Sequence, residues 1–365
     1  MSYKVGIVGC SGAVGQEMIA VLGDRGFPVS ELHLFASSRS AGKVFPTPFG
    51  EITVEEFSVE KTSGLDFVLL AVSGSFAQEH ARTIAAAGPV VIDNSSALRL
   101  EDDIPLVCPE VNAAAIGDAK LISNPNCSTL ILNVALWPLH QAYGLKKVIV
   151  STYQATSGGG APAMEELREQ TQNYLEGKPV THEKFAHPIP FNLIPQIDTF
   201  QENLYTKEEM KVTKETRKIF SEPELPISCT AVRIPTFRAH AEAVTIETAK
   251  PIDPDAARDL LRSAAGVEVV DDPDDLQYPM PLTATEKPRT GVPSCVLRTS
   301  PFLPTLPAMV ICFMLPIPSL LAPPGRRDLP HARLRVDPRT PAAPAFAPKR
   351  ARLAPSPRPQ FAIEA

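Results

Sequence analysis

The chain has 365 residues, 44% of them hydrophobic, which is sufficient for two domains with buried cores. Its formal net charge of -6 argues against a nucleic-acid partner, because binding a polyanion requires a concentrated positive surface, whereas a small anionic ligand requires only local charge. The six cysteines form no Cys-x-x-Cys pair, so neither a metal site nor a disulfide framework is indicated.

The amino terminus leads directly into a short apolar run and lacks the basic start and long apolar stretch of a signal peptide. A later apolar stretch, Met309 to Ala322, is short and contains Pro316 and Pro318, which makes it a poor membrane span. Together with cysteines that suit a reducing compartment, these features predict a cytoplasmic protein without a membrane partner.

Residues 1–126 alternate short apolar runs with helical patterns, which is typical of a parallel sheet with crossover helices. We therefore predict an α/β fold with a doubly wound, Rossmann-like dinucleotide-binding domain over this range. The expected strands are Tyr3 to Val8, Glu31 to Ala36, Leu65 to Val72 and Val90 to Asp93, and the expected helices are Ala13 to Leu22 and Phe76 to Ala87.

A glycine-rich loop, Gly9 to Gly15, joins the first expected strand to the first expected helix. Glycines let the backbone approach a pyrophosphate, whose charge would face the helix N-terminus. A turn with packing duties alone is the other interpretation. The predicted cofactor contacts in this loop are Gly9, Ser11, Gly12, Ala13, Val14 and Gly15.

The second expected strand is followed by Ser37, Ser38 and Arg39, where an NAD-selective site usually has an acidic residue. Hydroxyl groups and a guanidinium suit the 2′-phosphate of NADP instead. We predict NADP(H) as the cofactor, and a solvated serine-rich loop with an incidental arginine is the alternative.

Cys127 follows Asn124-Pro125-Asn126, between a short strand (Lys120 to Ile122) and an apolar helix (Ser128 to about Ala142). Most isolated cysteines are inert, but the positive end of a helix favours thiolate over thiol. The sequence therefore predicts a nucleophilic cysteine at this position.

Residues 127–287 have longer, more alternating strands, which predict a second, α+β domain with a mostly antiparallel sheet. The expected strands are Lys146 to Gln154, Ser228 to Ile234 and Ala241 to Thr248, and the expected helices are Ala163 to Leu175, Lys207 to Phe220 and Pro254 to Ala264. Residues 288–365 contain 17 of the 38 prolines and an excess of arginine and lysine, so we expect a largely irregular, disordered tail.

Five motifs in this order resemble the aspartate-semialdehyde dehydrogenase family over about Ser2 to Lys287. They are Gly9 to Gly15, Asn94 to Arg99, Asn124 to Thr129, Gln154 to Gly158 and Arg233 to His240. The tail lacks the strands and C-terminal helix with which the family continues, and both a shifted reading frame and a divergent tail would explain its composition.

The resemblance implies NADPH-dependent reduction of L-4-aspartyl phosphate to L-aspartate-4-semialdehyde through a cysteine thioester, in aspartate-family amino-acid biosynthesis. It also implies that residues 127–287 form the catalytic and dimerisation domain of a homodimer or homotetramer. The implied catalytic residues are the nucleophile Cys127, the acid/base His240 and the orienting Gln154. The implied substrate-binding residues are Arg99, Asn126, Glu208, Lys211 and Arg233, and Ser157 and Gly158 would bind the nicotinamide end of the cofactor.

Each of these residues also has a structural interpretation, such as a surface ion pair between Glu208 and Lys211 three residues apart on a helix. N-acetyl-glutamyl-phosphate reductase, which shares the architecture and thioester chemistry, is an alternative activity. Asn126 and the Glu208–Lys211 pair favour the aspartyl substrate over the acetylated one. A nucleotide-binding remnant impaired by its C-terminus is the non-enzymatic alternative.

Overall fold

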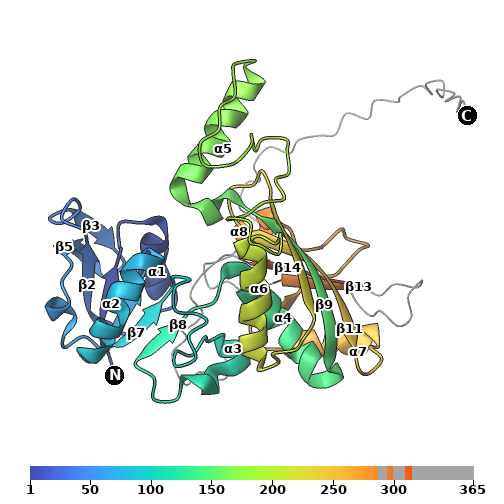
Figure 1. The fold of residues 1–365 in the computed structure, drawn as a ribbon, viewed down its shortest axis with the longest axis horizontal. Coiled ribbons are helices and arrows are strands. Elements are labelled where there is room, and N and C mark those ends of the chain that lie inside the picture. Colours follow the sequence, from blue (N-terminus) through green and yellow to red (C-terminus); the bar gives the residue numbers. More distant parts are fainter. Residues whose placement is uncertain (287–293, 299–308, 315–365) are drawn as a thin grey trace, which may run out of the picture. The chain divides into compact units, whose positions relative to one another are not determined.

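A computed structural model describes residues 1–286, 294–298 and 309–314, the last two segments as backbone only. Its first sheet contains only parallel strand pairs and has the strand order β5-β2-β1-β6-β7-β8 (Figure 1). This confirms the predicted doubly wound sheet. The strands are β1 (Tyr3–Val8), β2 (Val29–Ala36), β5 (Glu55–Glu56), β6 (Phe67–Leu70), β7 (Val90–Asp93) and β8 (Leu121–Ser123).

Helices α1 (Ala13–Asp24) and α2 (Gly74–Ala86) cover this sheet. Successive residues of a strand point to opposite faces of a sheet. One face of β1 therefore packs in a hydrophobic cluster with α1, and its other face packs in a separate cluster with α2. Sequence analysis missed the β3–β4 hairpin (Val44–Thr47 and Gly50–Thr53) and, between β7 and β8, the short helix α3 (Pro109–Asn112). The single-turn segments η1 (Glu60–Thr62) and η2 (Ala113–Ile116) complete this part.

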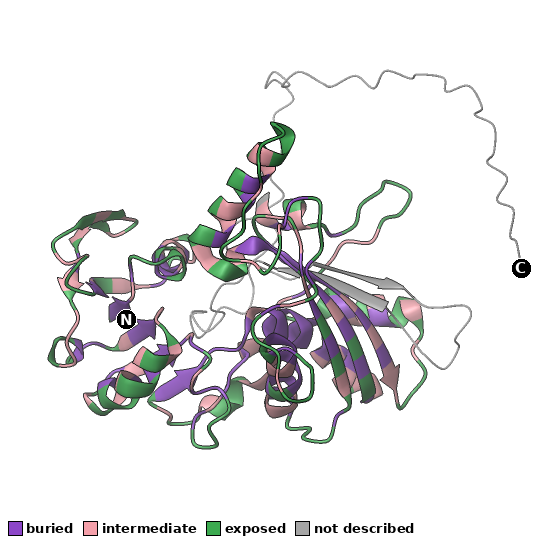
Figure 2. Cartoon of the chain, turned by 45° about the horizontal axis from the view of Figure 1, so that its top comes forward, coloured by how far each residue is buried: buried purple, intermediate pink, exposed green. Residues whose placement is uncertain are grey.

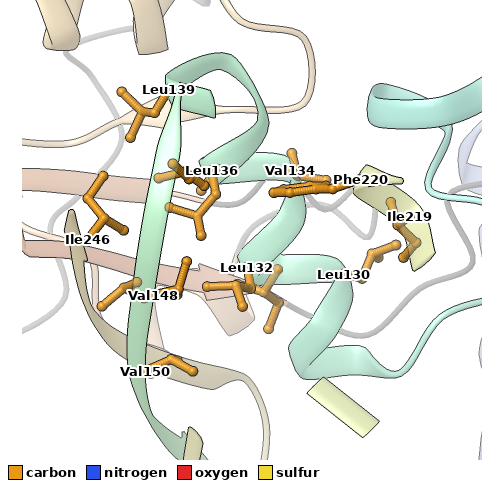
Figure 3. Packing of buried hydrophobic residues seen from close by; sticks show 14 of the residues in the cluster. Leu130, Leu132, Val134, Leu136, Leu139, Val148, Val150, Ile219, Phe220 and Ile246 are labelled. Atoms are coloured by element: carbon orange, nitrogen blue, oxygen red, sulfur yellow. The ribbon is translucent and has the colours of Figure 1, made fainter. Parts of the chain in front are cut away.

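Helix α4 (Cys127–Tyr143) is apolar on almost all sides and is buried from Ser128 to Leu136. Figure 3 shows its leucines packed against strands of the second sheet on one side and against helix α6 on the other. A helix that is hydrophobic all round is stable only inside a protein. The residues of this cluster that Figure 3 labels are Leu130, Leu132, Val134, Leu136 and Leu139 of α4 and, packed around them, Val148, Val150, Ile219, Phe220 and Ile246.

The second sheet has the strand order β10-β9-β11-β14-β13-β12, with three antiparallel and two parallel pairings. Buried residues alternate with more exposed ones along β9 and β10, as Figure 2 shows, because one face packs on α4 and α6. The predicted mostly antiparallel α+β sheet is thus confirmed. Its strands are β9 (Leu145–Gln154), β10 (Ile227–Arg233), β11 (His240–Thr248), β12 (Glu268–Val269), β13 (Ser294–Arg298) and β14 (Met309–Met314).

Helix α6 (Lys207–Phe220) begins with a capping box, in which Thr206 accepts from the Glu209 amide and Glu209 accepts from the Thr206 amide. The other Glu209 oxygen accepts from the Ala231 amide at 2.9 Å, which fixes α6 on β10. The remaining elements are η3 (Thr156–Gly159), α5 (Gly160–Leu175), α7 (Pro254–Ser263) and α8 (Pro281–Glu286).

Strands β13 and β14 lie within the segment predicted as a tail, and β14 pairs with β11 from His240 to Thr245. The expectation of an irregular tail from residue 288 is therefore wrong for these two strands. The other residues of the expected tail lie outside the described part of the chain. Within the described ranges, no helix is both long and apolar enough to cross a membrane. The domain boundaries at residues 126 and 287 stay predictions.

We predict that Leu132→Ala lowers the free energy of unfolding by about 2–5 kcal/mol, because this fully buried side chain would leave a cavity in the α4 core. Leu282→Ala, at a side chain that is 76% exposed, is the matched control and should change stability far less. Denaturant unfolding of both variants measures the difference, and equal losses would contradict the packing described for α4.

Candidate active site

The glycine-rich loop joins β1 to α1 as predicted, and its glycines differ in what they do. A Cβ on Gly9, which has φ +84°, would collide with the Ala71 carbonyl, and one on Gly15 would collide with the Gly9 carbonyl. Packing thus explains these two positions. A Cβ on Gly12, by contrast, would make only an ordinary contact with the Gly9 carbonyl, at 3.5 Å, and Gly12 is the N-cap of α1.

The four residues Ser11 to Val14 are exposed, so the first turn of α1 is accessible to an anionic group. The Gly9 amide donates to the Phe35 carbonyl at 2.8 Å, which holds this loop beside the end of β2. Directly after that end lie the exposed Ser37, Ser38 and Arg39, with no acidic residue among them. These residues fit a dinucleotide whose pyrophosphate lies at α1 and whose 2′-phosphate lies at Arg39.

Cys127 is the first residue of α4, and Asn126 is the helix cap. The Asn126 side-chain oxygen accepts from the amides of Ser128 at 3.0 Å and Thr129 at 3.3 Å. This cap fixes the start of the helix and therefore the position of the Cys127 side chain.

Glu208, on α6, joins several of the predicted site residues. Its Oε1 accepts from Asn126 Nδ2 at 2.9 Å and from Gln154 Nε2 at 3.1 Å, and its Oε2 lies 3.1 Å from Lys211 Nζ. Burial acts to raise the pKa of Glu208, but Lys211 and the two amides outweigh it, so the pKa lies below its usual value. Glu208 is therefore an ionised, buried group rather than half of a surface ion pair.

Glu215, which sequence reasoning missed, is the second buried carboxylate of α6. It accepts from the Asn126 backbone amide at 2.7 Å and from Arg99 Nη1 at 3.0 Å. Burial raises the pKa of Glu215, against the effect of Arg99. The helical spacing of Glu208, Lys211 and Glu215 places them on one face, a signal that could have identified Glu215.

Lys211 also lies 3.1 Å from Asp198 Oδ2, so two carboxylates already surround the ammonium group predicted to bind phosphate. Asp198, another residue that sequence reasoning missed, lines a pocket of about 270 Å³ together with Arg233, Lys184 and Gln196. This pocket is the candidate space for a small substrate beside Arg233.

Arg233 and His240 meet around the backbone of Ala155, directly after Gln154. Arg233 Nη1 donates to the Ala155 carbonyl at 2.6 Å, and the Ala155 amide donates to His240 Nδ1 at 3.0 Å. A Cβ on Gly158 would lie 2.8 Å from Arg233 Nη1 and 3.5 Å from His240 Nε2. Gly158 therefore borders the space in front of both side chains, whereas the buried hydroxyl of Ser157 has no hydrogen-bond partner among the described residues.

The titration of the two reacting groups differs from what their sequence positions predict. Burial raises the pKa of the Cys127 thiol to about 12, and Glu208 acts in the same direction against Arg99 and Arg233. In the ligand-free protein, burial therefore opposes the helix-stabilised thiolate that the sequence predicts. Burial, followed by Arg233, lowers the pKa of His240 to about 4, so the ring is neutral at pH 7.

The structure thus brings most of the predicted catalytic and substrate-binding residues together. Asn126, Gln154, Glu208 and Lys211 form one hydrogen-bonded network, Arg99 joins it through Glu215, and Arg233, His240 and Gly158 surround Ala155. The cofactor loop is linked to this group through α1, where Glu17 lies 2.7 Å from Arg238 in the segment that leads to His240.

Comparison with known proteins agrees with this arrangement. Residues 4–119 match the family model "Semialdehyde dehydrogenase, NAD binding domain", and residues 136–299 match "Semialdehyde dehydrogenase, dimerisation domain". The second match includes β13 and so extends beyond residue 287, where the expected resemblance ended.

The chain is 48% identical over 289 residues to the aspartate-semialdehyde dehydrogenase of Aquifex aeolicus, covering 78% of this chain and 85% of that protein. It is 46% identical over 296 residues to the Bacillus subtilis enzyme, covering 78% and 84%. The crystal structure of aspartate semialdehyde dehydrogenase II from Vibrio cholerae superposes with a TM-score of 0.81 at 38% identity, covering 86% of this chain and 93% of that one. The chain belongs to the aspartate-semialdehyde dehydrogenase family.

Proposed function

We propose that this protein reduces L-4-aspartyl phosphate to L-aspartate-4-semialdehyde, reversibly, with NADPH as reductant and a thioester on Cys127 as intermediate. The observation that carries the proposal is the position of Cys127 at the capped start of α4, with Asn126, Gln154 and Glu208 hydrogen-bonded beside it. The similar Vibrio cholerae structure complexed with ASA supports a semialdehyde as ligand of this fold. The relatives named above favour the aspartyl substrate over an acetylated glutamyl substrate.

The charges at the site suit a small substrate with a carboxylate and a phosphate. Arg233 borders the pocket and has only one of its guanidinium nitrogens bound to Ala155, so its planar fork can grip the substrate carboxylate. Arg99 has an Nε without a partner among the described residues, which suits it for the phosphate. Lys211 adds positive charge nearby, and Glu208 balances the substrate amino group.

In the proposed reaction, Cys127 Sγ forms a bond to the acyl carbon and the bond from that carbon to the phosphate oxygen breaks. NADPH held at Ser11 to Val14 and Arg39 would supply the hydride that reduces the thioester. The bond between carbon and Sγ then breaks and releases the aldehyde. Gln154, held by Glu208 and Thr152, orients the acyl group through these steps.

The match to a dimerisation domain supports assembly with a second copy, and we propose a homodimer or homotetramer. The described cysteines Cys10, Cys108, Cys127 and Cys229 are free thiols, which supports a cytoplasmic location.

Cys127→Ala should abolish turnover and leave cofactor binding largely intact, because the thiol makes the covalent bond while the glycine loop holds the dinucleotide. Cys127→Ser should have nearly as little turnover, since a hydroxyl is a far poorer nucleophile than a thiolate. An assay with aspartate semialdehyde, phosphate and NADP measures turnover, and cofactor titration is the control. Substantial oxidation by the alanine variant would remove the thioester mechanism, and an inactive wild-type chain would favour the impaired remnant.

Alkylation of ligand-free Cys127 by iodoacetamide should accelerate about tenfold per pH unit between pH 7 and 9, because the thiolate fraction rises with pH up to a pKa of about 12. Cys127→Ala provides the background from the other cysteines. A rate that levels off near neutral pH would show a thiolate already formed and would contradict the effect of burial.

Arg39→Ala should weaken NADP(H) binding by on the order of 2 kcal/mol, with much less effect on NAD(H), if its guanidinium makes a charged hydrogen bond to the 2′-phosphate. Arg39→Lys keeps the charge but loses the planar fork, so its loss should be smaller. Equal losses for the two cofactors would rule out this role for Arg39.

A further inference from the structure

Lys218, on α6, binds the backbone of the segment that carries Arg99. Its Nζ donates to the carbonyl oxygens of Arg99 at 3.0 Å, Glu101 at 2.6 Å and Ile104 at 2.9 Å. A lysine ammonium has three N–H donors and no acceptor, so these three carbonyls use all of its hydrogen bonds. The charge of Lys218 is thus committed to one turn of the backbone, from residue 99 to residue 104.

This turn has little structure of its own. Residues 94–105, between β7 and α3, contain neither helix nor strand. The buried side chains of Leu98 and Ile104 pack in the hydrophobic cluster of α2 and keep the turn on the first sheet. The ion pair between Arg82 and Asp103 is exposed on both sides, and pairs of that kind contribute little. Lys218 therefore adds to the apolar packing a fixed position relative to α6.

Helix α6 holds Arg99 at both of its ends. Glu215 accepts from Nη1 of the guanidinium at 3.0 Å, and Lys218 binds the backbone carbonyl of the same residue. Glu215 and Lys218 are three residues apart, so their side chains leave the same face of the helix. The usual bond at this spacing is an ion pair between the two side chains. Here Glu215 bonds Arg99 and the Asn126 amide instead, and Lys218 bonds carbonyls.

The position of the Arg99 guanidinium matters because part of it has no partner. Nη1 bonds Glu215, and Nη2 donates to the Asn94 carbonyl at 2.9 Å. Nε is buried and has no hydrogen-bond partner among the described residues. Buried polar groups are normally hydrogen-bonded, so Nε suits an anionic group that arrives with the substrate. The same Glu215 holds the Asn126 amide at 2.7 Å, so α6 also determines where this guanidinium lies relative to the start of α4.

We infer that Lys218 is a positioning residue for the phosphate group in the proposed reaction: its bonds to the turn at residues 99–104 set where the Arg99 guanidinium meets the phosphate, beside Cys127. Lys218 acts through Arg99 and does not touch the substrate. This inference rests on the proposed function, which supplies the phosphate role of Arg99. A positive charge acting through space and a bond that only stabilises the fold are the two rival explanations.

Two substitutions separate position from charge in the assay with aspartate semialdehyde, phosphate and NADP. Lys218→Met removes both, whereas Lys218→Arg keeps the charge but cannot direct three N–H groups from one nitrogen at three carbonyls. We expect the KM for phosphate to rise about tenfold in the methionine variant and at least about threefold in the arginine variant, because a displaced guanidinium loses part of a charged hydrogen bond. The KM for the semialdehyde should change less than about twofold, since Arg233 is the proposed carboxylate ligand.

Lys214→Met is the matched control, because Lys214 is an exposed lysine of the same helix. It should leave both KM values unchanged. An unchanged phosphate KM in Lys218→Arg would show that charge alone matters and would overturn the inference. An equal rise in the KM of both substrates would overturn it as well, because a general effect on the fold does not select phosphate.

A double-mutant cycle shows whether Lys218 acts through Arg99. Arg99→Gln removes the guanidinium and keeps a polar side chain, which leaves Lys218 with nothing to position. In that background, Lys218→Arg should raise the phosphate KM less than about 1.5-fold, because the effects of residues that act as one unit are not additive. The same rise with and without the guanidinium would overturn the inference.

Phosphate binding can also be measured without turnover, by ³¹P NMR titration of the NADP-loaded full-length protein with inorganic phosphate. We expect Lys218→Arg and Arg99→Gln to weaken phosphate binding and Lys214→Met to leave it unchanged. An inactive wild-type enzyme would refute the proposed function, and this titration would still decide the inference: phosphate binding that is absent or independent of Lys218 would overturn it. The packing of Leu98 and Ile104 should let both Lys218 variants fold, which thermal unfolding checks. Failure of both to fold would show that Lys218 serves the fold alone and would overturn the inference.

Discussion

The candidate active site depends on the buried carboxylates of α6, which hold the start of α4. Glu208 binds the Asn126 side chain and Glu215 binds the Asn126 backbone amide, so the residue before Cys127 is fixed at two points. Losing one partner of a buried charged pair costs several kcal/mol because the other charge stays buried. Lys218, further along α6, donates to the carbonyls of Arg99, Glu101 and Ile104. These bonds hold the segment that contains Arg99 against the same helix.

The same burial that makes these ion pairs rigid keeps the reacting groups neutral. Arg233 and Glu208 act in opposite directions on both Cys127 and His240, and desolvation remains the largest influence on both groups. A neutral thiol and a neutral imidazole resist unwanted chemistry in the absence of substrate. The charge of the proposed acyl phosphate would then enter a site in which the protein has already fixed its charged groups, which is the arrangement in which electrostatic stabilisation is strongest.

Sequence reasoning predicted features that depend on local patterns. The parallel strands of the first domain, the glycines of the cofactor loop and the position of Cys127 at a helix start all follow from periodicity and turn chemistry within about twenty residues. Strands β13 and β14 were missed because neighbouring prolines obscure them, although pairing with β11 stabilises β14. The bond between Arg99 and Glu215 joins residues 116 positions apart, so only the resemblance could suggest Arg99, and only the helical spacing from Glu208 and Lys211 could have suggested Glu215.

The protonation of the reacting groups was the least predictable property, because it depends on what surrounds them in three dimensions. A helix start predicts a thiolate at Cys127, yet desolvation outweighs the amide of Ser128 that favours that form. An ordinary histidine suits proton transfer near neutrality, yet a backbone amide 85 residues away in sequence blocks Nδ1 of His240. Burial shifts the pKa of both groups away from its value in water, and the fixed peptide of Ala155 adds a constraint on His240.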